Sequence, residues 1–149
     1  MTLLLLLVHG LAAAVLWGAV THQALAVSWP ARGRENGWWG ALRSVHPERY
    51  ALAVVVLFCF TLALGALLYP PFRVDVRAGY LDAQAPWGTG LFELKEHAAA
   101  IGLALLPLYW SAWRDPAVAG ARRGVTLALA AIVWFNFLVG HVVNNLRGL

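Results

Sequence analysis

Four long apolar runs dominate the chain and are separated by short polar segments. The runs cover residues 2–27, 50–69, 91–113 and 125–146. An α-helix rises about 1.5 Å per residue, so about 20 residues are needed to cross about 30 Å of hydrocarbon. The pattern therefore predicts an all-α integral membrane protein, in which four transmembrane helices run up and down as one bundle with short loops.

The length and composition leave little room for anything else. The chain has 149 residues, of which 61% are hydrophobic and only 12% are charged. We expect residues 1–149 to form a single transmembrane domain that is not an enzyme on its own. Ala24-Leu25-Ala26 is similar to a signal-peptide cleavage site. The apolar run before it is longer than that of a signal peptide and has no basic residues at its beginning, so we expect a retained helix.

Arginine is distributed unevenly among the polar segments. The first and third segments contain Arg32, Arg34, Arg43, Arg49, Arg114, Arg122 and Arg123, whereas the second contains only Arg73 and Arg77. Because cytoplasmic loops carry the excess of Lys and Arg, both termini are predicted on the outer, periplasmic side. The preference for Arg over Lys, with abundant Ala and Gly, favours a bacterial inner membrane. No basic face with interleaved aromatic residues is present, so a nucleic-acid partner is not expected.

Three histidines stand out because ionisable residues inside apolar runs are costly and are often functional. His9, His97 and His141 each lie one or two turns from the predicted outer end of a helix. In an up-and-down bundle the first and third helices are diagonal and the fourth neighbours both, so the three imidazoles are predicted to converge. Residues 51–68 of the second run contain no ionisable residue except Cys59, and we expect this run to be a packing helix.

Imidazole is a common axial ligand of haem iron, so the histidines indicate one haem b near the outer face. The diagonal pair His9 and His97 is the favoured ligand pair, with His141 as a hydrogen-bonding neighbour. Cations that could bind the propionates are Arg73, Arg77, Lys95 and Arg147. The helix count and histidine placement are similar to those of four-helix membrane b-type cytochromes, a similarity of arrangement rather than of motif. The predicted function is that of a small electron-transfer subunit, whose partners are the bilayer, other subunits of a redox complex, and quinone or an external carrier.

Other interpretations use the same residues. The three histidines could bind copper or zinc with Glu93, which shares a helix face with His97. Glu93, Glu96 and His97 could form a proton path or quinone pocket beside Tyr69 and Trp134. The histidines could also be structural, because an interfacial imidazole is satisfied by a backbone carbonyl or an Asn. The chain would then be a cofactor-free accessory or assembly subunit of a membrane complex.

Overall fold

The computed structural model describes residues 2–29 and 47–147, and all secondary structure in these ranges is helical. The elements are α1 (Thr2–Ser28), α3 (Pro47–Pro71), the π-helical η1 (Phe72–Leu81), α4 (Asp82–Gln84), α5 (Pro86–Arg114), the 3-10 helix η2 (Pro116–Ala121) and α6 (Arg122–Leu146). Each of the four predicted runs is confirmed as a helix. Several residues assigned to the cytoplasmic side lie outside the described ranges: Arg32, Arg34 and Arg43.

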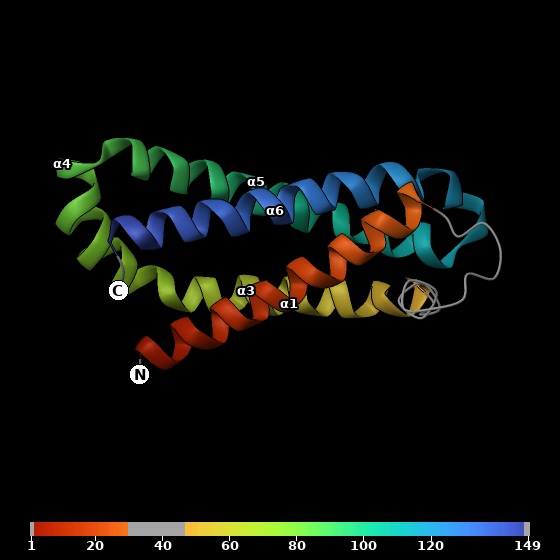
Figure 1. Ribbon diagram of the computed structural model, residues 1–149, viewed down its shortest axis with the longest axis horizontal. Helices are drawn as coiled ribbons and strands as arrows, with labels where there is room; N and C mark the ends of the chain where they lie inside the picture. The colour runs from red at the N-terminus through yellow and green to blue at the C-terminus, as the bar shows by residue number, and fades with distance from the viewer. Residues whose placement is uncertain (1, 30–46, 148–149) are drawn as a thin grey trace.

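The four long helices form an up-and-down bundle (Figure 1). Helix α1 packs against α3 and α6, and α5 packs against the same two helices, so α1 and α5 are diagonal as predicted. The beginning of α1, the end of α6, and α4 lie at one end, which we call the terminal end. The opposite end, which we call the loop end, contains η2 and the beginning of α3.

Three segments are long and apolar enough to cross a membrane: Thr2–Ser28, Glu48–Gln84 and Pro116–Leu146. Their outer surfaces are strongly apolar. Leu3 and Leu4 of α1, for example, are 66% and 67% exposed. An apolar surface of this kind is covered by lipid in a membrane bundle. The finding supports an integral membrane protein with three candidate spans, one fewer than the sequence predicts, because α5 is not among them.

The main hydrophobic core lies in the middle and the loop-end half of the bundle. It is formed by residues of all four long helices, including Leu16, Phe58, Tyr109 and Leu129. Gly102 of α5 allows close packing here, since a Cβ at this position would lie 2.7 Å from Cζ of Phe58. This well-packed half holds the helices in fixed positions relative to one another, and the terminal-end half is less filled.

The segment between α3 and α5 is helical rather than an irregular loop. Its Val76 and Leu81 are buried and pack against Val139 and Val143 near the end of α6. Arg77 connects the segment to α5, because its Nη2 lies 2.6 Å from Oε1 of Glu93. These contacts position the terminal ends of α5 and α6 beside the cavity described next.

Candidate functional site

A cavity of about 870 Å³ lies between α1, α3, α5 and α6 in the terminal-end half of the bundle. Most of its wall consists of Leu, Ala, Val and Phe side chains. The polar side chains that line it come from all four helices and the end of the chain: His9, Thr61, Tyr69, Lys95, Glu96, Asn136, His141, Asn144 and Arg147. An apolar cavity with a few convergent polar groups is the usual form of a small-molecule site.

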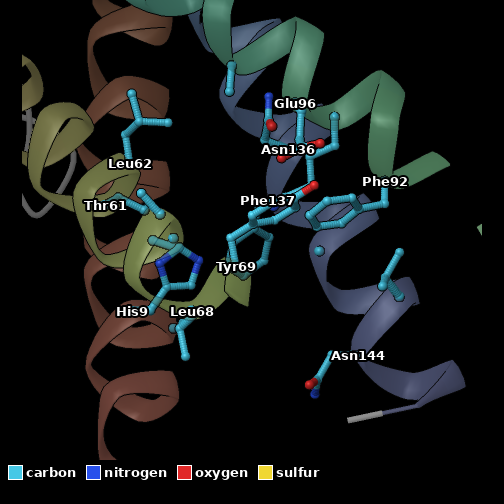
Figure 2. A pocket seen from close by; sticks show the side chains of 18 of the residues that line it. His9, Thr61, Leu62, Leu68, Tyr69, Phe92, Glu96, Asn136, Phe137 and Asn144 are labelled. Atoms are coloured by element: carbon cyan, nitrogen blue, oxygen red, sulfur yellow. The ribbon is translucent and has the colours of Figure 1, made fainter. Parts of the chain in front are cut away.

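His9 enters the cavity from α1. Figure 2 shows its ring against α3, close to Thr61 and Leu68, with Tyr69 beside it. The ring approaches the backbone of Thr61. A Cβ at Gly65 would lie 3.4 Å from Cε1 of His9, so the glycine leaves room for the imidazole. Within the described residues, Nδ1 of His9 is buried and has no hydrogen-bond partner.

His141 lines the same cavity from α6, the helix next to α1. His9 lies seven residues after Thr2, and His141 lies five residues before Leu146. At 1.5 Å per residue, both are about 8–11 Å from helix ends that lie at the terminal end (Figure 1). The two histidines therefore line one cavity at similar distances from the ends of their helices.

His97 is not part of the cavity. Its side chain is exposed, and its Nδ1 lies 2.7 Å from the carbonyl oxygen of Glu93, one turn earlier in α5. The residues of α5 that line the cavity include Lys95, Glu96, Ala99 and Leu103, whose spacing places them on one face of the helix. His97 lies outside that face. The structure thus brings two of the three predicted histidines together and leaves the diagonal partner of His9 outside.

The predicted loop cations are also placed outside the cavity. Arg77 pairs with Glu93 at 2.6 Å and lies 3.7 Å from Oδ1 of Asp82. Arg73 is exposed and does not line the cavity. Of the four cations expected near a ligand, the two that reach the cavity are Lys95 and Arg147.

The residues of the copper or zinc interpretation are not assembled. The Glu93 carboxylate is bonded to Arg77 and does not line the cavity. Within residues 2–29 and 47–147, no group of three His, Cys, Asp or Glu side chains is arranged to hold a metal ion. The quinone interpretation retains Tyr69 and Glu96, whereas Trp134 instead donates a hydrogen bond to Oγ1 of Thr21, at 2.9 Å.

Helix α3 contributes more to the site than its apolar sequence indicates. Thr61 and Tyr69 line the cavity, and the Oγ1 of Thr61 is buried without a partner among the described residues. Gly65 makes the space for His9. Neither a glycine nor a threonine interrupts the hydropathy of an apolar run, so the sequence pattern gives no signal for these roles.

Comparisons with protein-family models, curated proteins and solved structures find no match for this chain. The interpretation of the cavity therefore depends on its own residues. The fold and the site together define an all-helical bundle with three candidate membrane spans and a ligand-sized cavity near one end.

Proposed function

We propose that the protein is a small electron-transfer subunit that binds one haem b in this cavity, where His9 and His141 would hold it. The observation that carries the proposal is the position of the two imidazoles. They line one apolar cavity, at matched depth, from adjacent antiparallel helices. A pair of histidines projecting inward from the helices of a bundle is a common way to hold a haem.

The surroundings of His9 favour a ligand at its ring. A buried polar atom without a partner costs about 1–3 kcal/mol, and such atoms are rare in folded proteins. Nδ1 of His9 is such an atom. With one ring nitrogen holding the ligand, the other would donate to a nearby oxygen, and Thr61 lies close to the ring (Figure 2). That bond would fix the tautomer and the orientation of the ring.

The rest of the chain provides an environment suited to one-electron transfer, the chemistry that a bound haem supplies. Apolar side chains of α3, α5 and α6, among them Phe58, Leu103 and Val133, form the inner wall and keep water away. The four helices that line the cavity limit reorganisation around the ligand. The second core, with Val139 and Val143, holds η1 against the terminal end of α6.

The proposal includes four spans and a defined orientation. Helix α5 has 29 residues, about 44 Å, which exceeds the thickness of the hydrocarbon layer. Its charges Glu93, Lys95 and Glu96 lie near the terminal end, and Arg77 neutralises the first of them. The loop end contains Arg49, Arg114, Arg122 and Arg123 and would face the cytoplasm of a bacterial inner membrane. The haem would then lie near the periplasmic face.

A partner is needed, because the described residues form no soluble redox domain. The cavity is close to the proposed periplasmic surface. Electrons would pass between the haem and another subunit of a membrane complex, the quinone pool or an external carrier.

A quinone site is the second candidate, and a stack of aromatic rings favours it. The Phe92 ring lies 4.2 Å from that of Phe72 and 6.1 Å from that of Tyr69, both in stacked orientation. All three side chains line the cavity. Flat rings of this kind stack on a planar headgroup.

A reduced-minus-oxidised visible spectrum of the detergent-purified protein tests the proposal, with haem, metal and quinone analysis of the same sample. A sharp α-band with about one haem per chain is expected. A flat spectrum with bound quinone would support the second candidate, and a flat spectrum with neither ligand would support a cofactor-free accessory subunit.

A further inference from the structure

Two cations line the cavity, Lys95 of α5 and Arg147 just after α6. Within the described ranges, neither has a carboxylate oxygen within 4.0 Å, whereas Arg77 contacts two carboxylates. The acidic side chain that lines the cavity is Glu96, so the charges of the lining residues are two positive and one negative. The cavity therefore carries an excess of positive charge.

Aromatic rings and a glycine position both cations. Nζ of Lys95 lies 5.3 Å from the centre of the Phe92 ring, and the guanidinium of Arg147 lies 5.8 Å from that of Tyr80. A Cβ at Gly140 would lie 3.5 Å from Cε of Lys95, so the lysine stem passes close to α6 at this glycine. Cation–π contacts stabilise a cation and leave its N–H groups free to donate. Both side chains are thus prepared to bind an anion.

The charges of the lining residues favour an anionic partner. A cation taken out of water without a counter-charge is costly, and Lys95 is half-buried at the cavity wall. An arginine binds a carboxylate with two parallel hydrogen bonds, and a lysine binds it as a compact charge. A ligand with acidic groups along one edge would satisfy both cations.

We propose that Lys95 and Arg147 form an anion clamp that binds two carboxylates of the cavity ligand and turns its acidic edge toward the terminal end. This inference rests on the proposed function, since haem b carries two propionates on one edge. It names the chemical class of the ligand: a flat, apolar molecule with paired acidic groups. It also assigns the haem propionates to Lys95 and Arg147 rather than to Arg73 and Arg77.

The test compares protohaem IX with its dimethyl ester, in which both carboxylates are masked. Each is titrated into haem-free full-length protein in detergent, and binding is followed by the Soret band. The diacid is expected to bind the wild-type protein at least about tenfold more tightly than the ester, because the loss of one charge-assisted hydrogen bond weakens binding by about that factor. In the double variant Lys95→Gln/Arg147→Gln the two affinities are expected to become equal, with ester binding unchanged. Arg73→Gln is the matched control, because Arg73 lies outside the cavity.

Failure of the clamp and failure of the haem proposal give different results. Equal affinity of the wild-type protein for the diacid and the ester would overturn the clamp and leave the haem site standing. No binding of either compound would overturn the haem site and the clamp with it. The wild-type comparison does not depend on whether the double variant folds.

Discussion

Gly65 of α3 lies against the ring of His9 of α1: a Cβ added to the glycine would be 3.4 Å from Cε1 and 3.9 Å from Nδ1 of the imidazole. These are ordinary van der Waals distances, so Ala is tolerated at this position and a larger side chain is not. The His9 ring therefore fills the space that a larger side chain at Gly65 would need.

The first prediction follows from this contact. Gly65→Ala is expected to retain the haem of the wild-type protein, whereas Gly65→Leu displaces His9 and loses most of it. The measurement is the haem-to-protein ratio after purification, with thermal unfolding as a check on folding. Gly18→Leu in the same helix as His9 is the control, because nothing lies within 4 Å of a Cβ at Gly18 and this residue does not line the cavity. Full haem in folded Gly65→Leu would contradict this role of the glycine.

The helices are predictable from sequence because they depend only on apolar runs and helical rise. The rotation of each helix about its axis is less predictable. In a bilayer, the lipid-facing and core-facing sides of a helix are both apolar, so α5 gives little indication of which face is inward. His97 and Lys95 are equally plausible cavity residues by sequence, and the structure places only Lys95 there. The contribution of Gly65 cannot be predicted from the sequence either, because it depends on which face of α3 lies against His9.

The second prediction concerns the packing of α5 against α3. A Cβ at Gly102 would lie 2.7 Å from Cζ of Phe58 and 3.1 Å from Cγ2 of Ile132. Overpacking of this kind costs about 1–3 kcal/mol, so Gly102→Ala is expected to lower the midpoint of thermal unfolding in detergent. Gly90→Ala in the same helix is the control, since its Cβ meets nothing within 4 Å. Adding Phe58→Leu to Gly102→Ala is expected to restore part of the loss, and an unchanged midpoint in Gly102→Ala would contradict the close approach.

The third prediction concerns the ion pair between η1 and α5. Arg77→Gln and Glu93→Gln are each expected to lower the midpoint of thermal unfolding only slightly, because the side chains are 25% and 48% exposed and water screens the pair. The charge-swapped variant Arg77→Glu/Glu93→Arg is expected to recover part of that loss, and high salt is expected to reduce the difference. Additive effects in the double-mutant cycle would show that the pair contributes nothing.

The fourth prediction concerns the number of spans. In a Cys59→Ala background, single cysteines are placed at Ala83 near the terminal end and at Gly120 near the loop end, both exposed positions. A membrane-impermeant maleimide added to intact cells is expected to label Ala83→Cys, and Gly120→Cys only after lysis. The two positions flank α5, so labelling of both from the same side would mean that α5 does not cross the membrane.

The most direct test of the account is the haem content of four purified samples: wild type, His9→Ala, His141→Ala and His97→Ala. His9 and His141 line the cavity and His97 lies on the outer face of α5. Loss of haem from the first two variants, with full haem in His97→Ala, is the result that the account predicts. Full haem in folded His9→Ala and His141→Ala, or its loss from His97→Ala alone, would contradict it.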